Sequence, residues 1–435
     1  MHHRRLPIFV LLLTLALPAL ACNLPSRARM QPTSTPGSLA LATQPTVPTA
    51  TPNVELLPPM ATALAQERPL IPDSEIVYSP AALGFDVSAF IDSAGGYLSG
   101  YTETVDKETL NGAQIVQRVA EETSTNPRLL LGLLEYTSGW VFGQPVPGSD
   151  LAYPIGFENP AYRGLDRELR LAVRYLSQGY YAARAGQLGQ IVFPDGVAID
   201  LPAGSNPGMA ALYSLFARLM PFIDWQNAVL GSDGFIEFYS ARFGDPWERA
   251  TDPLLPDGLE QPALELPIPP GQTWAYTGGP HIAWGVGSPL GAIDLAPISG
   301  TGCKPAPQQA VAAAPGVVVR STRGALALDL DGDGNEQTGW VLVYMHLANR
   351  APVGSHVEKD EPLGNPSCEG GAATGAHVHL ARKYNGEWMG LDRVPYVLSG
   401  WVVEAGDKPY KGRLVRGSQV VTASSSGMSG SSVSR

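Results

Sequence analysis

The sequence predicts a multidomain protein in which an all-α domain is followed by an all-β antiparallel sandwich or barrel domain. Three observations support this fold class. Apolar side chains recur every three or four positions in residues 69–258, which is the spacing of a buried helix face. Short apolar runs separated by Gly-rich turns fill residues 259–416. The 48 Gly and 40 Pro, about a fifth of the 435 residues, exclude a helical or coiled-coil architecture throughout.

The first 21 residues have the pattern of an export signal. Arg4 and Arg5 precede an apolar run, residues 6–17, that is short for a membrane span. Small residues then lead to Cys22, in an order that resembles a bacterial lipobox, where the cysteine receives a lipid. We therefore expect residues 1–21 to be a signal peptide and Cys22 to be a lipid anchor at the outer face of the cell membrane. Secretion without a lipid is the alternative.

Two further segments have compositions that do not support a core. Residues 22–68 are predicted to form an extended tether, because positions 31–60 hold seven Pro and six Thr. Residues 417–435 hold eight Ser and are predicted to be a frayed tail. The chain has 29 basic and 40 acidic residues, a net charge of −11. This balance argues against nucleic acid as a partner, because Lys and Arg are needed to neutralise phosphates.

Residues 69–258 are predicted to form the helical domain. Asn126 and Pro127 mark a helix start, because asparagine caps free amides and proline fits the first turn. A later helix begins near Leu165 and is predicted to end near Gly179.

One helix of this domain has a possible chemical role. Glu135 follows a run of leucines and precedes Trp140, an arrangement that loosely resembles the catalytic-Glu helix of lysozyme-like transglycosylases. The resemblance implies a general acid for glycosidic cleavage, since an apolar setting raises the pKa of such a carboxyl group. The alternatives are an exposed or capping glutamate, in a domain that binds glycan or acts as a spacer.

The predicted β domain holds every histidine that follows the export signal. These five residues lie within one hundred positions: His281, His346, His356, His377 and His379. On a strand, His377 and His379 point to the same face, because side chains alternate. Asp294 lies between Ile293 and Leu295, which are expected to face the core. Its carboxylate then needs a partner on the opposite face, either a cation or an ordinary hydrogen bond.

These residues together resemble the lysostaphin-type zinc endopeptidases, and among them the β-lytic branch. The β-lytic pattern of a Gly-Gly-x-His loop before Ile-Asp-Phe is matched by Gly278–His281 and Ile293–Leu295, with leucine in place of the aromatic residue. The Tyr-x-His-Leu motif is matched by Tyr344–Leu347, and the Gly-x-His-x-His motif by Gly375–His379. The resemblance covers about 140 residues, and the motifs occur in the order that the family has.

The resemblance implies one zinc ion with three protein ligands: His281, Asp294 and His379. It also implies that His377 and His346 are histidines outside the ligand set. One would take the proton of the attacking water, and the other would stabilise the oxyanion or return the proton to the leaving amine. We favour His377 as the general base and expect Tyr344, on the same strand face as His346, to contribute in a minor way. His356 is expected at the surface.

The remaining cysteines form a candidate pair. Once Cys22 is assigned to the lipid, Cys303 and Cys368 are left, and in an exported chain we expect them to form a disulfide. Two free thiols are the alternative.

An acidic loop partly matches a calcium-binding pattern. Asp329, Asp331 and Asp333 occupy alternate positions before Gly334, but the twelfth position is Trp340, where the calcium loop has a glutamate. A solvated Asp-Gly turn is the favoured interpretation, and calcium is the alternative.

The sequence thus predicts an exported zinc metalloendopeptidase that hydrolyses the peptides of peptidoglycan. Two alternatives remain open. One is a secreted proteinase that acts on Gly-rich proteins, and the other is an inactive wall-binding lipoprotein that activates other hydrolases.

Overall fold

The computed structural model describes residues 69–298 and 302–435. The expected signal peptide, the tether and Cys22 lie outside these residues. We call residues 69–258 the helical region and residues 259–435 the β region. Among the described residues, no helix combines the length and the apolar character that crossing a membrane requires.

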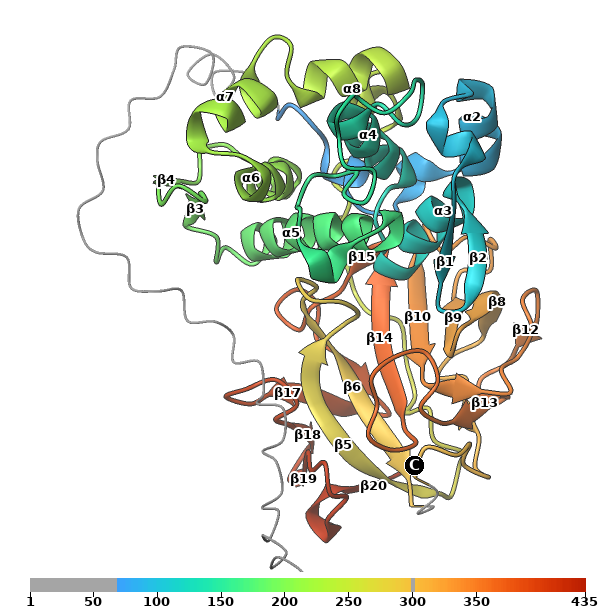
Figure 1. Cartoon of the computed structure of the whole chain (residues 1–435). Coiled ribbons are helices and arrows are strands. Elements are labelled where there is room, and N and C mark those ends of the chain that lie inside the picture. The colour runs from blue at the N-terminus through green and yellow to red at the C-terminus, as the bar shows by residue number, and fades with distance from the viewer. Residues whose placement is uncertain (1–68, 299–301) are drawn as a thin grey trace, which may run out of the picture. The chain divides into compact units, whose positions relative to one another are not determined.

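The helical region consists of α-helices, short 3-10 helices and two β-hairpins (Figure 1). The α-helices are α2 (Val87–Ala94), α3 (Gly112–Thr123), α4 (Pro127–Ser138), α5 (Leu165–Arg184), α6 (Pro207–Leu219), α7 (Phe222–Leu230) and α8 (Phe235–Phe243). The hairpins pair β1 (Thr102–Val105) with β2 (Glu108–Asn111), and β3 (Gln190–Val192) with β4 (Ala198–Asp200). The 3-10 helices here are η1 (Asp73–Glu75), η2 (Pro80–Ala82), η3 (Tyr97–Gly100), η4 (Pro160–Tyr162) and η5 (Pro246–Arg249). The region is mainly helical as predicted, but the hairpins show that it is not all-α.

Local sequence explains where these helices begin and end. Helix α4 begins as predicted, with the Asn126 side chain accepting the Arg128 amide and Pro127 in the first turn. Helix α5, in contrast, continues beyond Gly179 to Arg184. A Cβ atom at Gly179 would lie 2.4 Å from the Ala210 carbonyl oxygen of α6. Gly179 therefore permits a close helix contact, and the prediction that it ends the helix is wrong.

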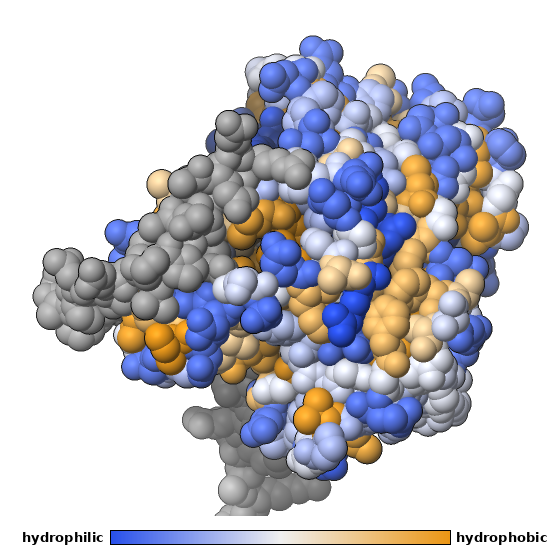
Figure 2. Space-filling model, turned by 90° about the horizontal axis from the view of Figure 1, so that it is seen from above, coloured by the Kyte–Doolittle hydropathy of each residue, from blue (hydrophilic) through white to orange (hydrophobic). Residues whose placement is uncertain are grey.

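The outer side of the helical region exposes few large apolar side chains. Seen from above, hydrophobic residues form separate patches among hydrophilic ones (Figure 2). The exposed large apolar side chains of the helical region include Leu83, Phe142 and Ile223. The helices otherwise turn their apolar faces inward, as the helical spacing predicts.

The β region contains one large antiparallel sheet and two smaller sheets (Figure 1). The large sheet is formed by β5 (Thr273–Ile282), β6 (Leu290–Pro297), β8 (Gly316–Thr322), β9 (Ala325–Asp329), β10 (Trp340–Met345), β12 (His356–Val357), β14 (Val378–Tyr384), β15 (Glu387–Trp388) and β20 (Ser432–Ser434). Its strands run in the order β12-β8-β9-β10-β14-β6-β5-β20, and β15 pairs with β14. The smaller sheets are formed by β7 (Ala310–Val311), β11 (Leu347–Ala348) and β13 (Pro362–Pro366), and by β16 (Val397–Leu398), β17 (Trp401–Ala405), β18 (Gly412–Arg416) and β19 (Gln419–Thr422). The antiparallel β prediction is confirmed.

The two faces of the large sheet are covered differently. Because side chains alternate along a strand, Ile293, Leu295 and Leu380 enter the core of the β region. Their neighbours Ala292 and Ala381 lie on the opposite face, in a hydrophobic cluster that also contains the core of the helical region. Asp294 and His379 share the parity of these alanines. The helical region therefore packs on the sheet face that carries the candidate metal ligands.

Polar contacts reinforce this junction between the two regions. Glu387 is 1% exposed and accepts hydrogen bonds from Tyr180 and from Arg184, whose guanidinium also pairs with Asp73 at 3.1 Å. The Trp388 amide donates to the Tyr181 hydroxyl, at 3.1 Å. The helical region thus supplies hydrogen-bond partners for Glu387 and Trp388 of the β region.

Residues 417–435 are not a frayed tail. They contain β19, the 3-10 helix η6 (Ser429–Ser431) and β20, and β20 pairs with β5 at the edge of the large sheet. Val433 is 1% exposed and lies in the core of the β region. The Ser-rich composition does not predict this short strand, in which Val433 is the single buried apolar side chain.

Candidate metal centre

Three neighbouring strands position the predicted metal ligands. His281 lies near the end of β5, Asp294 on β6 and His379 on β14, and Asp294 is directly opposite His379 in the ladder. The register of β5 against β6 shifts on either side of His281, which turns the end of β5. Gly278 faces Asp294, and a Cβ atom there would lie 2.2 Å from the carboxylate. The glycine therefore leaves room for the Asp294 side chain.

The three donor groups converge on one point. The Nε2 atom of His281 lies 2.9 Å from the Nδ1 atom of His379. The Asp294 Oδ1 atom lies 3.3 Å from the first nitrogen and 3.5 Å from the second. All three residues are buried. The structure thus brings together the predicted ligand set from segments almost one hundred residues apart.

The hydrogen bonds of the two imidazoles determine which nitrogens are free. His281 Nδ1 lies 2.8 Å from the Gly279 carbonyl oxygen, and His379 Nε2 lies 2.9 Å from that of Ala283. Carbonyls only accept, so these ring nitrogens carry the hydrogens of the neutral rings. The other nitrogens, His281 Nε2 and His379 Nδ1, therefore point lone pairs at each other and at Asp294.

This grouping of acceptors fits a cation. Asp294 Oδ1 is buried and has no hydrogen-bond partner among the described residues. Burial alone would raise the pKa of Asp294, but His281 and His379 outweigh it and hold the pKa well below its usual range. Burial lowers the pKa of His379, which favours the neutral ring that a metal requires. Two imidazoles and one carboxylate are a donor set that suits zinc.

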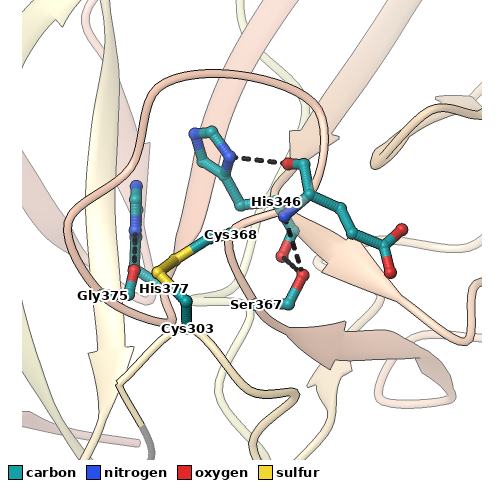
Figure 3. Close-up of a disulfide and its surroundings, with 7 residues drawn as sticks. Cys303, His346, Ser367, Cys368, Gly375 and His377 are labelled. Atoms are coloured by element: carbon teal, nitrogen blue, oxygen red, sulfur yellow. Dashed lines mark hydrogen bonds between the residues drawn. A yellow bond between two sulfur atoms is a disulfide. The ribbon is translucent and has the colours of Figure 1, made fainter. Parts of the chain in front are cut away.

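Two further histidines lie beside the three candidate ligands. His377 Nε2 is 3.6 Å from Asp294 Oδ1, and the ring centroids of His377 and His346 are 4.5 Å apart. Their Nδ1 atoms bind the carbonyl oxygens of Gly375 and Glu369, both at 2.8 Å (Figure 3). Each neutral ring therefore has its free lone pair on Nε2. Burial and the neighbouring His377 lower the pKa of His346 to about 4.

Tyr344 lies away from this centre, and its predicted place beside His346 is wrong. It is fully buried in the core of the β region, where its hydroxyl accepts the Ala313 amide at 2.9 Å. His346 follows the end of β10 with φ +62°, so the strand alternation that would place both side chains on one face does not continue to it. The contacts described for Tyr344 lie in the core of the β region, and none of them is with a histidine.

Tyr410 lies at the site, although no pattern in the sequence indicates it. Its ring stacks on His281, with centroids 4.1 Å apart and an angle of 18° between the planes. Gly279 donates to the Tyr410 carbonyl at 3.0 Å, and the Tyr410 amide donates to Pro280 at 3.1 Å. Tyr410 is 51% exposed and lies in a turn between β17 and β18. Only the folded arrangement reveals that this turn packs against His281, a candidate ligand.

The remaining predicted residues lie elsewhere. Cys303 and Cys368 form the expected disulfide, next to the histidine pair (Figure 3). His356 is exposed on β12.

Glu135 is held by the loop that follows α4. One carboxylate oxygen accepts the Val141 and Phe142 amides at 2.8 and 3.1 Å, and the other lies 3.9 Å from Arg242. These contacts give the side chain a loop-capping role.

The acidic loop is organised by its own backbone. Asp329 accepts the amides of Asp331, Gly332 and Gly334, and the carboxylates of Asp329, Asp331 and Asp333 approach one another. Burial and the nearby Asp331 raise the pKa of Asp329 to about 6. Hydrogen bonds of a turn thus satisfy Asp329, which is buried rather than solvated, and the three carboxylates are close enough to hold a cation.

In its fold and its candidate metal centre, the chain resembles the lysostaphin-type, β-lytic-like metallopeptidases. Comparison with known proteins confirms this resemblance. Residues 69–256 match the family described as LasA, N-terminal domain. This match gives no support to the lysozyme-like interpretation of the helical region.

Curated relatives extend the similarity into the β region. The chain is 29% identical to Protease LasA of Pseudomonas aeruginosa over 292 residues, which covers 62% of this chain and 65% of that protein. It is 29% identical to the β-lytic metalloendopeptidase of Achromobacter lyticus over 194 residues, or 42% of this chain and 47% of that one. The chain thus spans less than two thirds of the length of these relatives. A solved M23 metalloprotease, pseudoalterin, is 24% identical over 38% of this chain and 96% of its own, with a TM-score of 0.32.

Proposed function

We propose that the chain is an exported zinc metalloendopeptidase that hydrolyses peptide bonds in peptidoglycan. The observation that carries the proposal is the convergence of three buried donors, His281, Asp294 and His379, beside a second pair of histidines. A structural zinc site usually has four protein ligands, whereas a catalytic site has three and an open position. The similarity to one protein named as a protease and to another named as a β-lytic metalloendopeptidase supports the same reaction.

The proposed mechanism uses the free nitrogens of the second pair. When bound, zinc would polarise the scissile carbonyl and lower the pKa of the attacking water. His377 Nδ1 is bound to the Gly375 carbonyl, so Nε2 is the atom that takes the proton from the water. The same Nε2 then returns this proton to the nitrogen of the leaving amine. His377 is favoured as the base because its Nε2 faces Asp294, at the edge of the metal centre.

His346 supports this exchange as the neighbour of His377, since the two ring centroids are 4.5 Å apart. Its lowered pKa, about 4, keeps the ring neutral at neutral pH, with a lone pair on Nε2. In this form the ring accepts a hydrogen bond from the water or the leaving amine. It donates to the developing oxyanion only when protonated.

The same centre could serve a secreted proteinase that acts on Gly-rich proteins, while an inactive wall-binding lipoprotein would not need it. The residues that the family resemblance requires are present at all five positions, and this favours an enzyme over the inactive module. These positions are His281, Asp294, His346, His377 and His379. A lysozyme-like activity of the helical region is not part of the proposal, because the contacts of Glu135 are those of a loop cap. Lipidation at Cys22 and release by a signal peptidase remain predictions from the sequence.

A paired digestion tests the proposal. Purified full-length protein is incubated with peptidoglycan and with an elastin-like protein, with and without a zinc chelator, and new amino groups are measured. We expect chelator-sensitive release from peptidoglycan. Release from the elastin-like protein alone would favour the Gly-rich proteinase. A zinc-loaded protein that cleaves neither substrate would contradict the enzymatic proposal.

A further inference from the structure

Ser367 connects the two histidines that do not belong to the ligand set. It lies between β13 and the Gly-rich loop, beside Cys368, and is 1% exposed. Its hydroxyl donates to the His346 carbonyl oxygen at 2.9 Å and accepts the Glu369 amide at 3.1 Å. Its own amide donates to the same His346 carbonyl at 2.6 Å. Both hydrogen-bonding functions of the hydroxyl are therefore in use.

These bonds close a ring around His346. The Glu369 carbonyl accepts the His346 Nδ1 hydrogen at 2.8 Å, while the Glu369 amide is held by the Ser367 hydroxyl. His346 itself has φ +62°, a left-handed conformation that is unfavourable for a residue with a bulky side chain. Two donors from Ser367 hold its carbonyl in this conformation. The backbone and the ring of His346 thus depend on the same hydroxyl.

Ser367 also reaches the second histidine. It forms an isolated antiparallel bridge with His377, whose amide lies 3.4 Å from the Ser367 carbonyl oxygen. None of the hydrogen bonds described for Ser367 joins it to His281, Asp294 or His379. Its influence on the pair is therefore separable from its influence on the metal ligands.

We propose that Ser367 is a positioning residue that sets the distance and the ring orientation of His346 and His377. The inference rests on the proposed function, because it assigns these two histidines to proton transfer. Without the hydroxyl, the Glu369 amide loses its acceptor, and the carbonyl that fixes the His346 ring is free to rotate. Proton transfer is sensitive to such movement, since displacement of about 1 Å can reduce a rate about 100-fold.

The test compares Ser367→Ala with Ser79→Ala in the full-length protein. Ser79 is a matched control in the helical region, because it is fully buried, donates to the Ser74 carbonyl and accepts the Ala81 amide. We expect Ser367→Ala to lower kcat roughly 10- to 100-fold while KM and zinc content stay unchanged. Ser79→Ala should leave kcat unchanged at a comparable loss of Tm, and Ser367→Thr should restore part of kcat through its hydroxyl.

A second measurement does not depend on activity. Long-range proton–nitrogen NMR of the metal-free protein reports which ring nitrogen of His346 carries hydrogen. We expect Nδ1–H alone in the wild type and in Ser79→Ala, and a mixture of tautomers in Ser367→Ala. Unchanged tautomers, loss of zinc or an unchanged kcat in Ser367→Ala would overturn the inference. If the wild type shows no hydrolysis, the proposed function fails, while the NMR comparison still tests the positioning.

Discussion

Backbone carbonyls, not acidic side chains, fix the histidines of this centre. Each of the four rings gives one N–H to a carbonyl, and these acceptors are Gly279, Ala283, Glu369 and Gly375. A ligand histidine whose second nitrogen is held in this way keeps one tautomer and one orientation. The backbone segments that supply these carbonyls therefore determine the tautomer and the orientation of each ring.

The first prediction separates metal binding from proton transfer. His377→Ala should retain zinc and reduce hydrolysis about 100- to 10,000-fold, because a positioned general base contributes about that much. Zinc content and peptide hydrolysis are measured on the same sample. His356→Ala is the matched control, since this histidine is exposed on β12. Loss of zinc in His377→Ala would show that His377 is a ligand.

The second prediction concerns Tyr344. Tyr344→Phe removes the acceptor of the buried Ala313 amide, so the free energy of unfolding should fall by about 1–3 kcal/mol. The value of kcat should not change, because the hydroxyl faces the core. Urea unfolding and steady-state kinetics measure both quantities. A lower kcat at unchanged stability would show that Tyr344 contributes to catalysis.

At the scale of elements, a buried ion cluster joins β8 to β14, the strand that carries His379. Lys383, at the end of β14, and Arg320, on β8, both pair with Glu336, at 2.6 and 2.7 Å. All three side chains are buried. Burial alone would raise the pKa of Glu336, but the two cations outweigh it and lower the pKa to about 2. The carboxylate thus stabilises two strands that would otherwise bury unpaired cations.

The third prediction follows from this cluster. Glu336→Gln should lower the free energy of unfolding by about 3–5 kcal/mol, because breaking a buried ion pair leaves charges without compensation. Glu404→Gln, which removes a solvent-exposed pair with Arg413, should cost less than about 1 kcal/mol. Urea unfolding at pH 7 compares them. Equal losses in the two variants would contradict the role of burial.

The fourth prediction is the pH dependence of the same carboxylate. Its pKa is lower in the folded than in the unfolded protein, so its stabilisation is complete above the unfolded value of about 4.5. This contribution should be lost as the pH falls from about 4.5 to 2, where Glu336 becomes protonated in the folded state. The free energy of unfolding of Glu336→Gln should fall less steeply than that of the wild type over this interval. Parallel curves would contradict the prediction.

The sequence predicted elements best where local patterns decide structure. The cap at Asn126 and the alternation of Ile293, Asp294 and Leu295 were sufficient to place a helix start and a strand face. It failed at Gly179, where a tertiary contact with α6 explains the glycine, and at His346, where the strand ends one residue earlier. The candidate metal ligands are predicted by a resemblance between motifs. Tyr410 and Ser367 could not be found, because their roles exist only in contacts between distant segments.

At the scale of the molecule, the helical and β regions share one hydrophobic cluster. Ala381 and Val343 of the large sheet pack with the helical core, and Glu387 is enclosed by Tyr180 and Arg184. Separate domains usually meet through smaller and more polar contacts. Near residue 258 the chain changes from helices to strands, and the face of the large sheet that meets the helices belongs to the same hydrophobic cluster as the helical core.

The fifth prediction is cooperative unfolding of both regions. Because one cluster joins them, urea should unfold the full-length protein in a single transition, with the same midpoint by far-UV circular dichroism and by tryptophan fluorescence. Trp388→Ala removes a buried ring from the junction and should lower this midpoint for both signals. Two resolved transitions in the wild type would contradict a shared core.

The pairing of β20 with β5 has a consequence for the solubility of the protein. The last strand occupies the edge of the large sheet, where β5 would otherwise present unpaired amides and carbonyls. Exposed edges of this kind recruit strands from other molecules. The Ser-rich segment thus covers Thr273–Ala275, the first residues of the strand that carries His281, and leaves fewer free backbone groups there for strands of other molecules.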